Sequence, residues 1–494
     1  MTPRSRLRLP SLALLLAACG DPSAGATATE GGAGATSSGG EGTTLAPTTG
    51  PEEPELPGMP APEPLVRHVD PFIGTGGVGY GIGSAFPGPQ VPFGLARPGP
   101  DTTLLGGLAL PFSHCSGYSY EDTEVQGFSQ TRMHGTGIVD YGAVRLMPTL
   151  GFSPDKLEVG GYRRGLDKAS EAASPGYYRV DLVDGIGVEL TATARVGLHR
   201  FTFPEGQAEP VVLFDMAHAL TDVDVVGGRV AIDPVAGEIR GYHHVEGGYS
   251  NRSGGVKMYY AARFSRPFVE SGTWSDGAIT KDGEQEGAKV GAYLRFEPGE
   301  PVVVAVGLSF VDEAHAASNL DAEAKDLDFD GARAAAEAAW EQQLARVHLR
   351  GERPRDFKLF YTALYHALMM PTLASDADGS YRGLDGAVHQ TDHPYYTDFS
   401  LWDTFRTQHP LLTLLYPEVQ ADMLRSLTKM AVDGGYMPRW PLGTGYTGGM
   451  VGESATVVYA DSVVKGFDPA AIGLDAAYAA MRETATAPVP PGSP

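Results

Sequence analysis

The sequence is poor in positive charge. Its 494 residues include 37 Lys and Arg against 60 Asp and Glu, which gives a formal net charge of −23. Nucleic-acid binding needs Lys and Arg clustered on one face, so no nucleic acid is expected as a partner. The acidic balance suits a neutral partner or a cation instead. Hydrophobic residues make up 42% of the chain, which is enough for a large buried core.

Cysteine is almost absent, with only Cys19 and Cys115 in the chain. Cys19 ends the segment LAAC, which follows three early arginines and a mostly apolar run over residues 9–18. That run is shorter than the roughly 20 apolar residues of a membrane span and is typical of a signal peptide. Its ending resembles the bacterial lipoprotein processing box, which implies a signal peptide over residues 1–19 and lipid attachment at Cys19. The alternative is an ordinary secretory signal cut nearby.

Either kind of signal directs the protein out of the cytoplasm. The lipoprotein interpretation predicts an exported protein that a lipid anchor holds at a bacterial membrane, in the periplasm or on the cell surface. If Cys19 is acylated, Cys115 has no cysteine to pair with, and no internal disulfide can form.

Several common catalytic motifs are missing as well. The sequence has no G-x-S-x-G elbow and no Walker A loop, so acyl and phosphoryl transfer lack support. GTGGVG at residues 74–79 matches G-x-G-x-x-G, but Pro87, Pro89 and Pro92 follow too closely for the helix that a dinucleotide site needs. We interpret it as a loop that needs glycine and is open to close approach of a ligand.

The composition changes along the chain. Residues 20–64 are rich in Gly, Ser, Thr and Pro without apolar periodicity, which predicts a disordered tether. Residues 65–325 carry strand patterns between Gly and Pro turns, for example Tyr178, Val180 and Leu182 at period two. This predicts a β-sandwich domain, with a barrel less favoured at this length.

A helical period follows the strand patterns. Residues 326–350 predict a linker helix with Asp330 as a possible cap. Residues 351–487 predict a short run of about six helices, one of which Pro417 opens and Gly434 closes. The fold class expected is therefore β followed by α.

The stretch YYTDFSLWDTFRTQHPLL, residues 395–412, holds the strongest candidate site. The indole of Trp402 suits the C–H face of a sugar, and the Asp403 carboxylate suits two adjacent hydroxyl groups. Arg406 is placed to fix that carboxylate by a charge-assisted bond. The loop YMPRWPLGTGY adds a second indole, Trp440. The alternative is a helix start, with Asp403 favoured by the helix dipole and Trp402 packed in the core.

A second polar, glycine-rich cluster is GFSQTRMHGTGIVDYG, residues 127–142. Its Arg132, His134 and Asp140 are candidates to line a pocket, although a lone histidine is more often a structural residue. The cluster has no metal-ligand spacing such as H-x-x-x-H, so no zinc site is expected there.

Several segments, in order, resemble glycoside hydrolase family 92: VDPFIGTGG, FPGPQVPFGLARPGPDT, SGYSYEDTEVQGFSQTRMHGTGIVDYGAVRLMPTLG, TATARVGLHRFTFPEG, FSLWDTFRTQHPLLTLLYPE and GGYMPRWPLG…MVGESATVVYADSVVKGF. The resemblance covers about residues 66–485. It implies a calcium-dependent exo-α-mannosidase that acts on α-mannosides of N-glycans or mannan. The implied fold is an N-terminal β-sandwich, a linking helix and an (α/α)6 barrel, with the site between the two domains.

The resemblance also implies a set of substrate-binding residues. The Trp-Asp pair of SLWDTFR would grip the terminal mannose, and two glycines of the GTGGVG loop would reach the same pocket. The histidine of SQTRMHGTG stands where the family reads closer to SHTHLSGTG, so this segment departs from the pattern. The expected set is Gly76, Gly77, His134, Trp402, Asp403, Arg406 and Trp440.

The family's catalytic segments have no counterpart in this sequence. Members of the family invert, with a Glu general acid and an Asp general base, carried by stretches near ESVSKTLEYAYDD and GNDDCGQMSAW. Neither stretch is present, so no catalytic residue is assigned. Calcium is expected for the full-length family but not with a complete ligand set here, and its ligands stay unknown.

The length of the helical part also indicates that the family's catalytic segments are missing. Twelve helices with their loops need roughly 190 residues, whereas residues 351–487 are 137 in number and residues 488–494 predict a disordered tail. This predicts an incomplete barrel and a C-terminally truncated chain. Three hypotheses follow: a truncated mannosidase, a non-catalytic surface glycan-binding lipoprotein, or one half of a split enzyme whose C-terminal half is a separate chain.

Overall fold

The structure is a computed structural model, and it describes residues 58–77, 84–102, 114–157, 160–206 and 209–487. These residues belong to one compact unit, Leu56–Pro494. The predicted signal peptide, Cys19, most of the predicted tether and the predicted tail lie outside the described residues. The last residues of the predicted tether are ordered instead. There β1 (Met59–Pro60) pairs with β18 (Arg350–Gly351) as an antiparallel two-stranded sheet.

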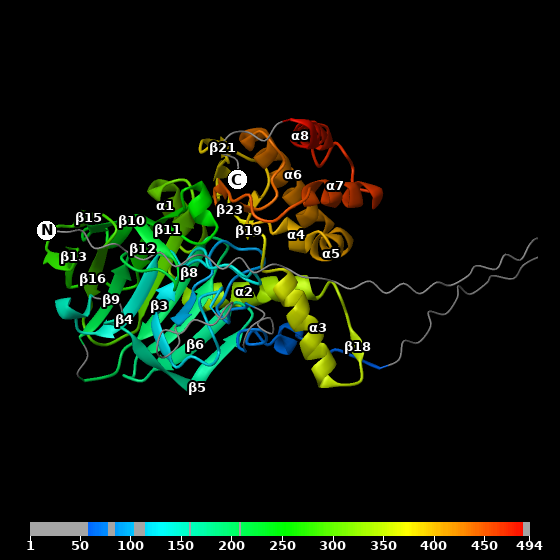
Figure 1. Ribbon diagram of the computed structural model, residues 1–494. Helices are drawn as coiled ribbons and strands as arrows, with labels where there is room; N and C mark the ends of the chain where they lie inside the picture. The colour runs from blue at the N-terminus through cyan, green and yellow to red at the C-terminus, as the bar shows by residue number, and fades with distance from the viewer. Residues whose placement is uncertain (1–57, 78–83, 103–113, 158–159, 207–208, 488–494) are drawn as a thin grey trace, which may run out of the picture. The chain divides into compact units, whose positions relative to one another are not determined.

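Antiparallel strands dominate the N-terminal part (Figure 1). Within the described residues, one hydrogen-bonded path joins sixteen strands in the order β14-β13-β16-β9-β4-β3-β5-β6-β7-β8-β17-β12-β11-β10-β15, with β2 beside β3. Their bounds are β2 (Gly99–Thr102), β3 (Glu124–Ser129), β4 (Arg145–Leu150), β5 (Arg164–Ser174), β6 (Tyr177–Leu182), β7 (Gly187–Ala192), β8 (Val196–Thr202), β9 (Pro210–Asp215), β10 (Asp224–Asp233), β11 (Glu238–Glu246), β12 (Val256–Phe264), β13 (Glu270–Ser275), β14 (Ala278–Thr280), β15 (Glu284–Glu286), β16 (Val290–Arg295) and β17 (Val302–Ser309).

The alternation of apolar and polar residues, from which the strands were predicted, is visible in β6. Tyr178, Val180 and Leu182 are at most 2% exposed and join the main core, whereas Arg179 between them is exposed. Each alternate side chain therefore faces the core, as a half-buried strand requires. Strand β5 pairs with both β3 and β6 and so connects the two halves of the sheet path.

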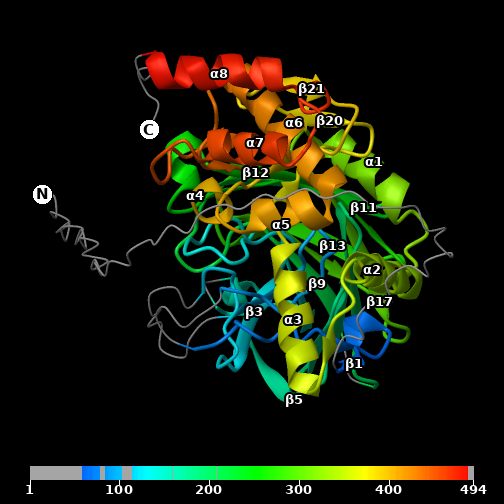
Figure 2. The ribbon, with the colours of Figure 1, turned by 90° about the vertical axis from the view of Figure 1, so that its right-hand side faces the viewer.

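Helices follow the strands along the chain (Figures 1 and 2). Their bounds are α1 (Glu313–Glu323), α2 (Phe329–Leu344), α3 (Pro354–Ala367), α4 (Leu401–Thr404), α5 (Gln408–Leu415), α6 (Pro417–Gly434), α7 (Ser454–Val464) and α8 (Leu474–Thr486). Helix α6 opens at Pro417 and ends at Gly434, both as predicted, and the next residue, Gly435, has a φ of +82° in the left-handed region that stops the helix. Among the described helices, none is both long and apolar enough to cross a membrane.

Two local predictions were wrong. Helix α1 lies inside the range expected to be β. It packs its Ala316 and Leu320 against the sheet, where Gly307 leaves room for its backbone. The cap of α2 is Asp328, which accepts from the Gly331 N–H at 2.9 Å, and Asp330 lies inside the helix.

The helical part is also interrupted by short strands. Within the described residues these are β19 (Thr372–Leu373) with β22 (Tyr396–Thr397), β20 (Ser380–Arg382) with β21 (Val388–Gln390), and β23 (Pro441–Leu442) with β24 (Gly445–Tyr446). Three 3-10 turns are described, η1 (Leu65–His68), η3 (Pro154–Lys156) and η4 (Ser250–Ser253). Helix α6 contacts α5 and α8, and α5 contacts α7. The chain thus has a large β-rich N-terminal part and a helical C-terminal part.

Candidate functional site

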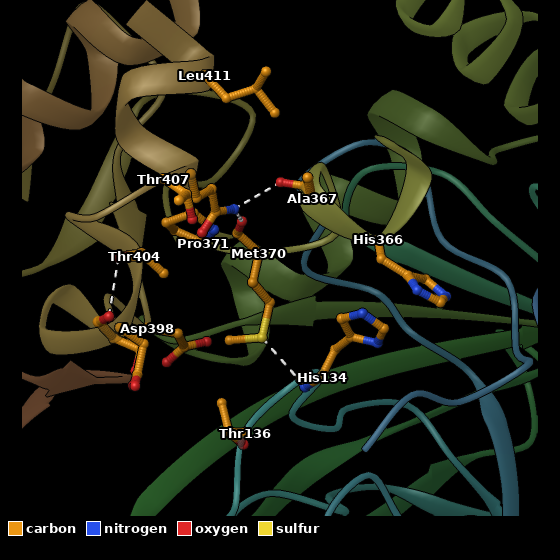
Figure 3. Close-up of a pocket in the computed structure, with 14 residues that line it drawn as sticks. His134, Thr136, His366, Ala367, Met370, Pro371, Asp398, Thr404, Thr407 and Leu411 are labelled. Atoms are coloured by element: carbon orange, nitrogen blue, oxygen red, sulfur yellow. Dashed lines mark hydrogen bonds between the residues drawn. The ribbon is translucent and has the colours of Figure 1, made fainter. Parts of the chain in front are cut away.

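A cavity of about 380 Å³ lies where the helical part meets the loop after β3 (Figure 3). We call it the Asp403 cavity. The end of α3, the segment before α4, and the start of α5 supply most of its wall. Its lining residues are His134, Gly135, Thr136, His366, Ala367, Met370, Pro371, Asp398, Ser400, Asp403, Thr404, Thr407, Gln408 and Leu411.

Hydrogen bonds hold the helical wall of this cavity in place. The Gln408 side-chain amide donates to the carbonyl oxygens of Ala367 and Met370, both at 2.6 Å. The Thr404 hydroxyl donates to the Ser400 carbonyl at 2.9 Å. The Gln408 bonds tie α5 to the end of α3, and the Thr404 bond closes the first turn of α4.

Asp403 is an exposed carboxylate with one fixed oxygen. The Ser400 hydroxyl donates to Asp403 Oδ2 at 2.6 Å, and the Trp440 indole N–H donates to the Ser400 oxygen at 2.9 Å. The described residues donate no hydrogen bond to the other oxygen, Oδ1. The carboxylate is therefore oriented while one oxygen stays available to a ligand.

Asp398 is a second carboxylate of the cavity, and it is buried. Its oxygens accept from the Tyr141 hydroxyl at 2.8 and 3.0 Å and from the Gly443 N–H at 2.8 Å. Burial raises the pKa of Asp398, although these bonds and the charge of Arg97 oppose the rise. Its φ of +61° lies in the left-handed region, which costs energy for a residue with a side chain. The surrounding bonds offset that strain.

Two histidines form the opposite wall, and Figure 3 shows their rings side by side. The ring centres of His134 and His366 lie 5.0 Å apart. Burial lowers the pKa of His366 to about 4 and holds the pKa of His134 well below its usual value, to which His366 and the charge of Arg97 also contribute. His134 Nδ1 and His366 Nε2 are buried without a hydrogen-bond partner. Burial favours the uncharged form of both rings, and these two nitrogens are closed off from solvent.

The structure brings only two of the seven predicted residues, His134 and Asp403, to the lining of this cavity. Trp440 contributes indirectly through Ser400 and is itself buried. Trp402 is half-buried, and the Arg406 guanidinium lies 4.9 Å from its ring centre. Within the described residues Arg406 makes no ion pair with Asp403. The expected charge-assisted bond is thus replaced by a cation–π contact.

The two glycines of the GTGGVG loop lie elsewhere. Gly76 lines a separate cavity, and the Gly77 N–H donates to Glu121 Oε1 at 3.0 Å. Neither glycine lines the Asp403 cavity. The last two residues of that motif, 78 and 79, lie outside the described residues.

Arg132 and Asp140 are structural rather than cavity residues. Arg132 is 1% exposed, pairs with Asp101 at 3.0 Å and donates to several carbonyl oxygens. Asp140 accepts from the Ser250 N–H at 2.8 Å. Both therefore hold loops behind the cavity.

One group of described residues has a metal-like arrangement, His315, Asp376 and Asp378. Asp376 is already bonded through both oxygens, to Ser309 at 2.9 Å and to Asn319 at 2.7 Å, and burial raises its pKa to about 6. Calcium takes six to eight oxygen ligands, so this set of one nitrogen and two carboxylates does not fit it. We derive no step through calcium from these residues.

Sequence reasoning missed Asp398, His366 and Ser400. Asp398 and Ser400 stand within the quoted stretch 395–412, where a second acidic residue five positions before Asp403 was a usable signal. His366 gave no signal, because only the tertiary fold brings it beside His134.

Comparison with known proteins divides the chain at the same place, between its β-rich part and its helical part. The glycosyl hydrolase family 92 N-terminal domain matches residues 68–309, and the glycosyl hydrolase family 92 catalytic domain matches residues 315–493. The chain belongs to glycosyl hydrolase family 92.

Solved structures and one curated protein are similar to the chain. A family GH92 α-mannosidase from Bacteroides thetaiotaomicron has a TM-score of 0.78 at 32% identity, over 87% of this chain and 57% of that one. An inverting GH92 mannosidase of the same bacterium has a TM-score of 0.72 at 29% identity, over 83% and 54%. An uncharacterized secreted glycosidase of Arthroderma benhamiae is 27% identical over 448 residues, 84% of this chain and 51% of that protein. The chain thus spans just over half the length of these relatives.

Proposed function

We propose that the Asp403 cavity holds the terminal mannose of an α-mannoside, as the sugar-gripping part of an exo-α-mannosidase acting on N-glycans or mannan. The observation that carries this is the oriented Asp403 carboxylate, fixed by Ser400 and open at Oδ1. Two histidine rings, whose burial favours the uncharged form, line the same cavity. A related GH92 α-mannosidase has been solved with mannoimidazole, which supports this class of ligand.

We infer further that this chain by itself binds the sugar without cleaving it. Inverting hydrolysis needs two carboxyl groups roughly 6.5–9.5 Å apart with a water between them. Asp398 is committed to Tyr141 and Gly443, which leaves Asp403 as the one carboxylate free for a ligand among the described lining residues. No residue is assigned as general acid or base.

A second candidate function is one half of a split enzyme. Leu414, Val464 and Tyr478 are 75%, 86% and 59% exposed on α5, α7 and α8. Exposed apolar side chains on neighbouring helices favour a helical partner. Co-purification with a chain that carries two catalytic carboxylates would support this alternative, whereas a monomer that binds mannosides would favour a surface glycan-binding lipoprotein anchored through Cys19.

We also propose how the two parts of the chain correspond to the fold that the family resemblance implies. The sheet path is interpreted as a β-sandwich over residues 65–325, and α3 to α8 are interpreted as part of an (α/α)6 barrel. Residues 326–350 are interpreted as the linker helix, and the position of α2 within this range supports that interpretation. Calcium is expected for the family as a whole, and its ligands in this chain stay unassigned.

The test is a calorimetric titration of the whole chain with mannoimidazole. Wild-type protein is expected to bind, and Asp403→Ala is expected to lose most of the affinity. Asp326→Ala, at an exposed aspartate after α1, is the matched control and should bind as wild type does. Equal binding by Asp403→Ala and wild type would refute the proposed site. A mannose-release assay on the same samples tests turnover.

A further inference from the structure

A small cavity of about 20 Å³ lies on the β-rich part and shares no lining residue with the Asp403 cavity. We call it the Arg145 cavity. Strands β3, β4, β9 and β13 and the loop between β4 and β5 contribute to its wall. The lining side chains that carry the argument are Arg145, Lys156, Arg163, Asp215, His218 and Trp274. The function proposed above uses none of them.

The register of the sheet brings the floor of this cavity together. Arg145 of β4 lies opposite Asp215 of β9. The row continues through Gly291 of β16 to Trp274 of β13. Residues directly opposite one another share one face of a sheet. A Cβ on Gly291 would lie 2.0 Å from Cζ2 of Trp274, so the missing side chain lets the buried indole lie across β16 and line the cavity.

Asp215 is saturated with hydrogen bonds. Its Oδ2 accepts from Arg145 Nη2, and its Oδ1 accepts from the Ala217 N–H at 2.9 Å. His218 Nδ1 lies 3.1 Å from Oδ1 and 2.9 Å from Oδ2. Burial raises the pKa of Asp215, but the charge of Arg145 and the contact with His218 outweigh burial and lower that pKa below its usual value. The carboxylate therefore has no acceptor position left for another guanidinium nitrogen.

Two guanidinium nitrogens of the lining residues are left without a partner. Arg145 is 4% exposed, and its Nη1 donates to Gln126 Oε1 at 3.4 Å. Its buried Nε has no hydrogen-bond partner among the described residues. Arg163 donates from Nη1 to Glu124 Oε2 at 3.2 Å, and its Nε is also buried without a partner there. Because a buried N–H that bonds to nothing costs free energy, the cavity calls for an acceptor.

The charges around the cavity do not balance. Arg145, Arg163 and Lys156 are cationic, and the exposed Lys156 makes no ion pair within the part of the chain that the structure describes. Asp215 pairs with Arg145. Glu124 pairs with Arg163. Three cations against two carboxylates leave one excess positive charge, with histidine taken as neutral. This local excess, in a chain of net charge −23, favours an anion over a water molecule.

The size of the cavity decides which anion it can hold. One water molecule needs about 10–15 Å³, so a cavity of about 20 Å³ has room for one body slightly larger than water. Phosphate and sulfate carry four oxygens and are too large, and so is a sugar. A halide ion is a single atom that accepts hydrogen bonds from several N–H groups at once.

The wall of the cavity is held in place by contacts of its own. The Tyr162 hydroxyl donates to the Ser153 carbonyl at 2.8 Å and accepts from the Ser153 N–H at 2.9 Å. The ring of Phe152 stacks on Trp274 and on Tyr293, with ring centres 6.0 and 4.1 Å apart. These contacts fasten the loop between β4 and β5 to the sheet, so the cationic side chains are placed before an ion arrives.

We propose that the Arg145 cavity is a binding site for one small monovalent anion of the halide class, chloride. The ion accepts from Arg145 Nε and Arg163 Nε and offsets the excess charge to which Lys156 contributes. It joins the loop between β4 and β5 to the sheet and thereby stabilises the folded chain. The proposal stands on this cavity alone and does not rest on the function proposed above.

The test follows the thermal midpoint of the whole chain at constant ionic strength while sodium chloride replaces sodium gluconate. A ligand that binds only the folded state stabilises it, so the midpoint is expected to rise by about 1–2 °C for each tenfold increase in chloride above its Kd. Arg163→Gln removes one donor and one charge while Arg145 and Asp215 stay paired, and it should lose this rise. Arg179→Gln, at an exposed arginine of β6, is the matched control and should keep it.

A second variant guards against a folding defect in Arg163→Gln. Lys156→Met changes an exposed side chain and lowers the same excess charge. It is expected to need about two- to fivefold more chloride for the same rise, the range of one exposed ion pair. Lys281→Met, at another exposed lysine of the β-rich part, should respond to chloride as wild type does.

Bromide locates the ion directly. Crystals soaked in sodium bromide are expected to show an anomalous peak within hydrogen-bond distance of Arg145 Nε. No peak there, or a wild-type midpoint that is the same in chloride and in gluconate, would overturn the site. So would an equal rise with chloride in wild type, Arg163→Gln and Lys156→Met. A bromide peak without any dependence of the midpoint on chloride would mean binding at crystal concentration only, which also contradicts the proposal.

Discussion

Ser400 places its hydroxyl oxygen 2.6 Å from Oδ2 of Asp403 and thereby orients the carboxylate of the Asp403 cavity. The same oxygen accepts the Trp440 indole N–H at 2.9 Å, so a buried tryptophan on a distant loop fixes an exposed acidic side chain. A binding site gains affinity when its polar groups are oriented before the ligand arrives.

Removal of this hydroxyl is predicted to weaken binding without unfolding the protein. Ser400→Ala frees Asp403 to rotate and should weaken mannoimidazole about tenfold, the range of one hydrogen bond to a charged group. Ser318→Ala, at an exposed serine of α1, is the control and should bind normally. Titration calorimetry on the three proteins checks this. Unchanged affinity in Ser400→Ala would show that the serine does not orient the carboxylate.

Tyr141 is predicted to matter for stability more than for chemistry. Its hydroxyl donates to both oxygens of the buried Asp398. Tyr141→Phe leaves that carboxylate short of a donor, which should lower the free energy of unfolding by about 1–3 kcal/mol. Denaturant unfolding measures the change, with Tyr478→Phe as the exposed control. If Tyr141→Phe loses no more unfolding free energy than Tyr478→Phe, the prediction is contradicted.

Acid is predicted to destabilise the protein through His366. Burial lowers its folded-state pKa to about 4, whereas the unfolded residue titrates near 6.5. The unfolded state therefore binds the extra proton between these values, and stability falls as pH drops from about 6.5 to about 4. The slope for this one histidine is at most about 1.4 kcal/mol per pH unit.

His366→Gln removes that proton and should flatten the dependence of unfolding free energy on pH over this window. His348→Gln, at an exposed histidine, serves as the control. Urea unfolding at several pH values between 4 and 7 gives the slopes. Equal slopes for His366→Gln and wild type would contradict the burial of an uncharged His366.

Chelation is predicted to leave the thermal midpoint of this chain unchanged. The group His315, Asp376 and Asp378 is the one metal-like set among the described residues, and Asp376 is already bonded through both oxygens. Calorimetric scans with calcium and with a chelator check this. A higher midpoint in calcium that Asp376→Asn abolishes would overturn our reading of these residues.

The sequence predicted elements whose local signals were strong. Alternation in β6 and the Pro417 start of α6 were readable because each strand or helix shows one face to the core. Helix α1 was not predicted because two of its four buried residues are alanine and one is asparagine, which gives little hydrophobic contrast between its faces. The short strand pairs between α3 and α4 have two or three residues a strand, too few for a period.

The candidate site was predicted only in its local part. Asp403 and Trp440 were identified as candidates because carboxylates and indoles have a direct use in sugar binding. The bond between them through Ser400 was not, since it joins residues 40 positions apart. Arg406 was assigned to the neighbouring carboxylate, but two adjacent rings, Trp402 and Phe405, hold its guanidinium instead.

The most direct test of the central claim is a crystal structure of this chain with mannoimidazole. The account predicts the sugar in the Asp403 cavity, with a hydroxyl group within hydrogen-bond distance of Asp403 Oδ1 and another beside His134 or His366. A sugar bound elsewhere, or an Asp403 that makes no contact with it, would contradict the account.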